Sequence, residues 1–362
     1  MRVVGNKCIQ VALVLASVCL LAVLGAYTQA ASAAGAHPRI LLDTATTARL
    51  KQSAEEVSPA WTRLKARCDN YLTGTVEWPD GDGYPNGGNI GQGYQGQGYF
   101  PAILNLGLCY QIGTAAGVAQ ASQYGSKGAE LLYKMSAPPG DPHHVPPSTD
   151  SGYGIRFFGT GLAIGYDWFY DALDASARTR IADSMDEWIT YYEAAGFGRQ
   201  HPSGNYFAGY YAAKAYAGLA FEDDVAQGTD WLNSWQNDVH GTKVAPFFAD
   251  NLSGGGWPEG MGYGDLATAN MSIPALALFR AKGTNLTEGN NAYTFPLNQQ
   301  KYLTYFAWPG FTSLEDSGLI TQGDNPTPTS LKTFEIVGDI GRSFNDPFAP
   351  YFQSVTNKVA ES

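Results

Sequence analysis

The chain has 362 residues, of which 44% are hydrophobic and only 15% charged. It is therefore too apolar for a disordered polymer, and long enough for one large domain or a domain with an appendage. Its 33 acidic and 22 basic residues give a net charge of −11. Because nucleic-acid binding needs a basic patch and none is visible, we expect no nucleic-acid partner, and highly sulfated glycans are disfavoured for the same reason.

The N-terminus has the pattern of an export signal. Arg2 and Lys7 precede an apolar run over residues 11–24, and Ala-Ser-Ala follows at 31–33. A transmembrane helix needs about 20 apolar residues, so the run is short for a membrane anchor. We predict a cleavable signal over residues 1–33, a secreted or periplasmic protein, and no membrane association after cleavage.

Cleavage at that site leaves two cysteines, Cys68 and Cys109. In an oxidising compartment they can form a disulfide, and the alternative is two separate buried thiols. Two cysteines without a histidine cluster do not make a zinc site. We expect no metal and no cofactor.

Most of the mature chain has the pattern of helices joined by Gly/Pro loops. Residues 157–170 and 205–220 are apolar on nearly every side, which is typical of buried helices. After Asp174, which is a good N-cap, apolar residues fall on one side of a helix: Ala177, Ile181, Met185, Trp188, Ile189 and Tyr192. Alternating buried and one-sided helices predict a mostly α fold, an incomplete (α/α) toroid of inner and outer helices.

The expected domain organisation places this toroid at residues 34–310. Residues 311–362 are then a C-terminal segment, too short for a β-sandwich, which we interpret as the start of a truncated β-domain. Within it, residues 333–340 (Thr-Phe-Glu-Ile-Val-Gly-Asp-Ile) are the strongest strand candidate.

The first group of candidate site residues surrounds the start of the second buried helix. Asn205 lies at or near its N-cap, so it either caps the helix or hydrogen-bonds a substrate carboxylate. Residues nearby in sequence contribute further polar and aromatic groups: Arg199, His201, Tyr206 and Tyr210.

A second group follows a run of three glycines. Trp257 comes first, and Glu259 and Tyr263 are four residues apart, which places both on one face if the stretch is helical. Other candidates for binding a substrate flank the first buried helix (Tyr153 and Arg156) or lie in or just after a glycine-rich loop (Gln95 and Tyr99).

Four motifs resemble, in order and spacing, the heparinase II/III-like and alginate-lyase-like polysaccharide lyases. They are HPRILLD at residues 37–43, YDWFYDALD at 166–174, GNYFAG at 204–209 and GWPEGMGY at 256–263. The resemblance implies an (α/α) toroid that cleaves a uronate-containing polysaccharide by β-elimination. Asn205 matches the residue that neutralises the uronate carboxylate, and Tyr263 matches the catalytic tyrosine.

The chain departs from that family at the general base. Relatives often carry Asn-His where this chain has Asn205-Tyr206, and they take a His or Tyr from a C-terminal β-domain. The base is therefore His201 or Tyr206, or Tyr263 acts alone.

The sequence thus predicts a lyase for an acidic polysaccharide, with alginate favoured because its anionic groups are carboxylates only. Two other functions fit the same residues. One is a glycoside hydrolase with a carboxylate pair, either Glu259 with Asp265 or the cluster of residues 222–224. The other is a glycan-binding protein that has lost its base.

Overall fold

The computed structural model describes residues 36–74, 76, 98–150, 152, 154–289, 292–306 and 330–360. These residues form helices and connecting loops, with no β-strand among them, so the prediction of a mostly α fold is confirmed. The α-helices are α2 (Thr44–Glu55), α3 (Pro59–Thr73), α4 (Tyr99–Ala116), α5 (Ala121–Met135), α6 (Gly154–Trp168), α7 (Ala175–Ala194), α8 (Asn205–Phe221), α9 (Ala226–Ser234), α10 (Ala245–Asn251), α11 (Met261–Lys282), α12 (Phe295–Phe306), α13 (Leu331–Ser343) and α14 (Ala349–Ala360). A π-helical stretch, η5 (Trp235–Val244), joins α9 to α10.

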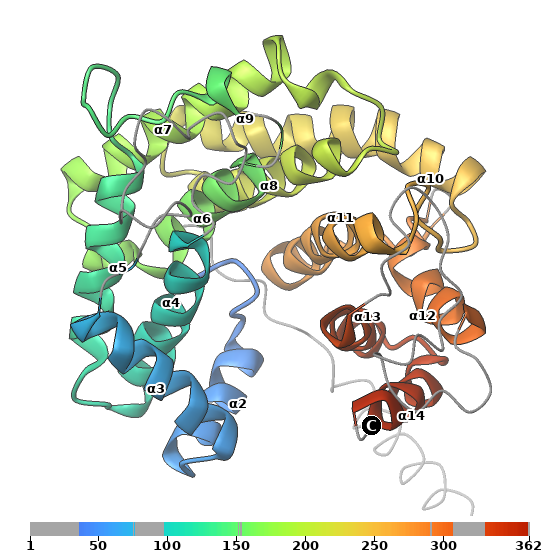
Figure 1. Ribbon diagram of the computed structural model, residues 1–362, viewed down its shortest axis with the longest axis horizontal. Helices are drawn as coiled ribbons and strands as arrows, with labels where there is room; N and C mark the ends of the chain where they lie inside the picture. The colour runs from blue at the N-terminus through green and yellow to red at the C-terminus, as the bar shows by residue number, and fades with distance from the viewer. Residues whose placement is uncertain are drawn as a thin grey trace, which may run out of the picture.

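The helices follow an open arch with an inner and an outer layer (Figure 1). Along the inner layer, α4 contacts α6, α6 contacts α8, α8 contacts α11, and α11 contacts α13. Each inner helix also contacts the helix that follows it on the outside: α5, α7, α9, α12 and α14. That this arch is the toroid of the lyases stays a prediction.

Local sequence explains the middle of the arch. The Asp174 side chain accepts a hydrogen bond from the backbone N–H of Ala177 at 2.8 Å and so caps α7. All six apolar positions predicted for that helix are buried, and α6 and α8 are buried on nearly every side, as predicted. This agreement shows that helical periodicity alone defines the inner and outer elements here.

Glycines bring α6 and α8 together. A Cβ added at Gly159 would lie 3.1 Å from the Cβ of Ala213, and one added at Gly209 would lie 3.0 Å from the Cβ of Arg156. Larger side chains at these two positions would push the helices apart. The close approach places Arg156 beside the first turn of α8.

The predicted strand at residues 333–340 is wrong, because this segment lies inside α13. Its Phe334, Val337 and Ile340 are buried at intervals of three residues, which is a helical spacing. α13 contacts α11, α12 and α14. Residues 330–360 therefore extend the helical layers and contain no part of a β-domain.

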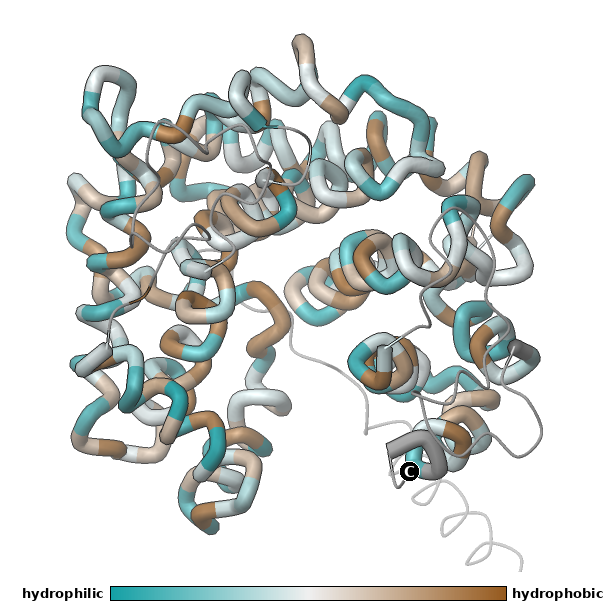
Figure 2. Tube along the Cα trace, viewed as in Figure 1, coloured by the Kyte–Doolittle hydropathy of each residue, from teal (hydrophilic) through white to brown (hydrophobic). Residues whose placement is uncertain are grey.

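Residues 36–43 lead into α2 on the inner side of the arch, and part of this stretch is hydrophobic (Figure 2). Its His37 ring joins two carboxylates, with Nδ1 2.7 Å from Asp167 and Nε2 2.8 Å from Asp224. Arg39 donates through NH1 to the carbonyls of Ala220 at 3.1 Å and Glu222 at 2.6 Å, at the end of α8. This N-terminal clamp accounts for the HPRI motif and uses part of the 222–224 cluster for structure.

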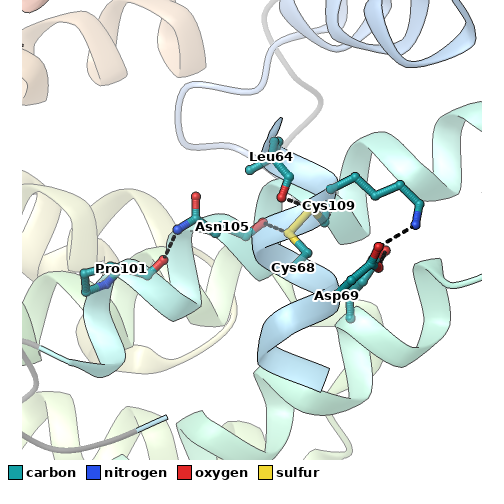
Figure 3. The surroundings of a disulfide bond; sticks show 8 residues. Leu64, Cys68, Asp69, Pro101, Asn105 and Cys109 are labelled. Carbon is teal, nitrogen blue, oxygen red and sulfur yellow. Dashed lines mark hydrogen bonds and ion pairs between the residues drawn. A yellow bond between two sulfur atoms is a disulfide. The ribbon is translucent and has the colours of Figure 1, made fainter. Parts of the chain in front are cut away.

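Cys68 and Cys109 form a disulfide that joins α3 to α4 (Figure 3). The sequence allowed either a disulfide or two separate buried thiols, and the structure has the disulfide. Both cysteines are fully buried. Beside Cys68 on α3, Lys65 Nζ and Asp69 Oδ2 form an ion pair 2.8 Å apart. Disulfides form and persist mainly in oxidising compartments.

None of the described helices combines the length and apolar character needed to cross a membrane. The predicted signal at residues 1–33 lies outside the described residues.

Candidate functional site

Asn205 is the first residue of α8, and Gly204 before it is the N-cap, with no capping side chain of its own. The Asn205 side chain is 4% exposed. It lies between a guanidinium on one side and a carboxylate on the other, and it does not cap α8.

The guanidinium comes from Arg156, in the first turn of α6. Its NH2 donates to the backbone carbonyl of Asn205 at 2.7 Å and to Asn205 Oδ1 at 2.9 Å. Arg156 is 3% exposed. The bond to Oδ1 fixes the orientation of the Asn205 amide, because it directs the amide oxygen toward α6 and the amide nitrogen the other way.

The carboxylate is that of Glu259, in the loop before α11. Its Oε2 accepts the backbone N–H of Asn205 at 2.8 Å and the indole Nε1–H of Trp257 at 2.9 Å. Asn205 Nδ2 lies 3.0 Å from both carboxylate oxygens. A carboxylate is favourable at a helix N-terminus, where backbone N–H groups carry partial positive charge, so Glu259 caps α8 from another segment.

These four residues, Arg156, Asn205, Trp257 and Glu259, form what we call the amide cluster. All four are site residues predicted from the sequence, and the structure brings them together from three separate segments. It also gives each a structural role, because the cluster joins the loop at 254–260 to α6 and α8.

Tyr263 lies in the first turn of α11, half-buried against the main core. Glu259 and Tyr263 would share one helical face only if both lay in a helix, and this condition is not met, since α11 begins at Met261 and Glu259 precedes it. No hydrogen bond joins the Tyr263 hydroxyl to another described residue. Within the described part of the chain, the hydroxyl therefore does not tie segments together.

A cleft of about 590 Å³ lies beside the amide cluster, and Trp257 borders both. Its lining combines aromatic rings with small polar groups: His201, Ser203, Phe247, Asn251, Leu252, Gly254, Gly256, Trp257, Pro258 and Tyr302. His201 is exposed, and its ring meets that of Phe247 edge-to-face at 4.4 Å. Of the predicted site residues, His201 and Trp257 line this cleft.

Tyr210 has a structural partner instead. Its hydroxyl donates to Glu193 Oε1 at 2.8 Å, and the same oxygen pairs with the buried Lys214. Burial, together with the Glu193 charge, raises the pKa of Tyr210 above its usual range. This phenol cannot form a phenolate near neutral pH, which makes it unsuited to act as a base.

The remaining predicted site residues are dispersed. Tyr206 is half-buried with its ring edge-on to Phe197 at 4.7 Å, and the exposed Arg199 donates to the carbonyl of Ala194 at 3.0 Å. Tyr99 is 1% exposed, and burial raises its pKa to about 12. Tyr153 and Gln95 lie outside the described residues.

The carboxylates suggested as the acid and base of a hydrolase already have hydrogen-bond or ion-pair partners within the protein. Glu259 is held in the amide cluster, and Asp265 accepts the backbone N–H of Ser330 at 2.9 Å. In the 222–224 cluster, Asp224 contacts His37 and Glu222 contacts Lys282 at 2.7 Å. Each of these carboxylates holds segments of the fold together.

Three residues of the cleft, Phe247, Asn251 and Tyr302, were not singled out from the sequence. They come from α10 and α12, and no motif surrounds them. Among the described residues, no group of three or more His, Cys, Asp or Glu side chains is placed to hold a metal ion.

Comparison with known proteins does not identify the chain. No protein-family model matches it, and no match was found among curated proteins.

Proposed function

We propose that this protein is a polysaccharide lyase that cleaves a uronate-containing polymer by β-elimination, with alginate as the first polymer to test. The observation that carries the proposal is the buried pair of Arg156 and Asn205 at the N-terminus of α8. The resemblance of four ordered motifs to lyases of this kind supports it.

The chemistry of elimination requires donors that neutralise the uronate carboxylate. Removal of the proton at C5 of a uronate places additional negative charge on its carboxylate. Donors that are fixed before the reaction stabilise that charge without having to reorganise. Asn205 Nδ2 and the N-terminus of α8 supply such donors, and Arg156 keeps the amide oriented.

Glu259 affects how a substrate would bind. Its carboxylate accepts hydrogen bonds from Asn205 Nδ2, at the position where a uronate carboxylate would bind in the proposed complex. In the proposed complex, the substrate carboxylate takes the place of one Glu259 oxygen at Nδ2. Binding therefore includes a small displacement of the loop at 254–260.

Tyr263 would then protonate O4 as the C4–O4 bond breaks and the C4–C5 double bond forms. The base that removes the C5 proton is His201, Tyr206 or Tyr263 itself. General acid–base groups of this kind contribute about 10²–10⁴-fold to a rate.

The second candidate is a glycan-binding protein without catalysis. The saturation of Asn205 by Glu259 favours it, because a permanent cap would leave the amide unable to bind a substrate carboxylate. Binding of uronates without turnover would select this function.

The test is the ultraviolet absorbance of the unsaturated end that elimination creates. Wild type is incubated with alginate, hyaluronan, heparan sulfate, chondroitin and polygalacturonate, and Asn205→Ala should lose most turnover. The matched control is Asp174→Ala, which also removes a side chain from a helix start, at a cost of about 0.5–2 kcal/mol, but far from Asn205 in sequence. Absence of unsaturated ends from every polymer, or full activity of Asn205→Ala, would contradict the proposal.

A further inference from the structure

The cleft beside Trp257 is formed by segments that lie apart in the sequence. The loop at 252–258 provides one wall, His201 and Ser203 provide another, and Tyr302 of α12 completes it. Its volume of about 590 Å³ falls in the range of small-molecule sites, roughly 300–1,000 Å³. It can therefore hold a compact ligand such as a sugar ring.

Aromatic rings give the cleft surfaces on which such a ring can pack. Phe247 is half-buried, with His201 at its edge. The ring of Tyr302 lies against Gly256, where an added Cβ would come within 2.8 Å of Tyr302 Cε2. The faces of aromatic rings carry partial negative charge and attract the slightly positive C–H groups of a pyranose.

Small polar groups complete the recognition. Ser203 and Asn251 line the cleft with a hydroxyl and an amide, which can exchange hydrogen bonds with sugar hydroxyls. A few polar groups placed among aromatic ones is the usual composition of a site that orients a ligand.

The charge of the lining restricts the ligand further. Among the described residues that line the cleft there is no Lys, Arg, Asp or Glu. Of the described lining residues, His201 is the one that can carry a positive charge, and only when it is protonated. A carboxylate placed there would therefore give up water without gaining a permanently charged partner, which costs free energy. The lining thus favours an uncharged sugar.

We infer that this cleft binds an uncharged pyranose unit of the polysaccharide, next to the uronate held at Asn205. The inference rests on the proposed function and narrows its substrate. It implies a polymer in which uronates are separated by uncharged sugars. Alginate differs, since every one of its residues carries a carboxylate.

The direct test is calorimetric binding of neutral hexasaccharides of β-1,4-linked glucose, mannose or N-acetylglucosamine to the whole protein. Wild type should bind at least one of them. Phe247→Ala should weaken that binding about tenfold or more, as truncation of a central aromatic contact does. The control is Tyr305→Ala, on α12, which removes a ring that is 77% exposed and does not line the cleft, and which should bind like wild type.

A second variant fills the cleft without removing any side chain. Gly254 lines it, and a Cβ added there meets no atom within 4 Å. Gly254→Leu should therefore block the neutral hexasaccharide while the melting temperature stays near that of wild type. This variant carries the test if Phe247→Ala fails to fold.

Two results would overturn the inference. One is that none of the neutral hexasaccharides binds, and the other is that binding is the same in wild type, Phe247→Ala and Gly254→Leu. Failure of the proposed function is a separate result, because it is the absence of unsaturated ends from every uronate polymer. Cleft-dependent binding without turnover would support the sugar site and contradict the lyase.

A substrate comparison adds a second readout. If unsaturated ends form, hyaluronan, in which uronate alternates with uncharged N-acetylglucosamine, should be cleaved faster than alginate. Phe247→Ala should reduce that preference. A preference for alginate that is the same in both proteins would contradict the inference.

Discussion

Asn205 and Glu259 hold each other by main chain and side chain together. The backbone N–H of Asn205 donates to Glu259 Oε2 at 2.8 Å, and its Nδ2 lies 3.0 Å from each carboxylate oxygen. One carboxylate thus receives both kinds of N–H group that Asn205 offers. This contact joins two segments that are 54 residues apart in the sequence.

The first prediction concerns Glu259→Gln. A glutamine has the same size but replaces one acceptor oxygen with an NH2 group, which would face the donors of Asn205 or Trp257. The free energy of unfolding should fall by about 1–3 kcal/mol, the cost of leaving a buried donor without an acceptor. Urea denaturation measures it. Glu288→Gln, at an exposed position, is the control, and equal losses in both variants would argue against the amide cluster.

The second prediction concerns Tyr263→Phe, which deletes the hydroxyl and keeps the ring. If the hydroxyl protonates the leaving oxygen, turnover should fall by about 10²–10⁴ with little change in substrate binding. Stability should not change, because no hydrogen bond to a described residue is lost. Tyr210→Phe is the matched control: it loses the bond to Glu193, so stability should fall and turnover should remain. A Tyr263→Phe enzyme with wild-type turnover would remove Tyr263 from the mechanism.

The third prediction is that stability depends on pH because His37 takes up a proton more readily in the folded state. Burial alone lowers the pKa of His37, but the hydrogen bonds to Asp167 and Asp224 outweigh it and raise the pKa above 6.5. The folded state therefore binds the proton more tightly than the unfolded state. The resulting stabilisation is fully present below about pH 6.5 and is lost as pH rises through the folded-state pKa.

His37→Gln removes this proton-linked stabilisation. The difference in unfolding free energy between wild type and His37→Gln should be larger at about pH 5.5 than at about pH 8.5. Denaturation at the two values measures it. A difference that does not vary with pH would mean that His37 has the same protonation in both states.

The fourth prediction concerns the disulfide. Replacing both Cys68 and Cys109 by serine frees a loop of 41 residues in the unfolded chain, and stability should fall by about 2–5 kcal/mol. A reducing agent should lower the melting temperature of wild type and leave the double variant unchanged. If wild type were insensitive to complete reduction, the bond would contribute nothing to stability.

The helices of the arch could be predicted because their signals are local. Asp174 and the apolar positions after it define α7 by capping and periodicity alone, and all-round apolar sequence defines α6 and α8. The strand prediction for residues 333–340 was wrong because β-branched and aromatic residues are compatible with a strand as well as with a buried helix. The burial of Phe334, Val337 and Ile340 against other helices determines its helical form.

The site was predictable only in part. Glu259 and Tyr263 share one face only if the stretch is helical, but Gly260 has a φ of 92°, a conformation that L-residues rarely adopt, and it separates the loop from α11. The contact between Glu259 and Asn205 has no local signal, since it depends on how two distant segments meet. The same holds for Phe247 and Tyr302, which only the folded chain brings to one cleft.

The N-terminal clamp has a consequence for the order of folding. The last carbonyls of a helix have no partner within the helix, and at the end of α8 Arg39 supplies a donor from 181 residues earlier in the chain. A contact between such distant residues is slow to form. The earliest part of the described chain must therefore stay available until residue 222 has been made. A protein exported during synthesis would complete the middle of its arch only after most of the chain had crossed.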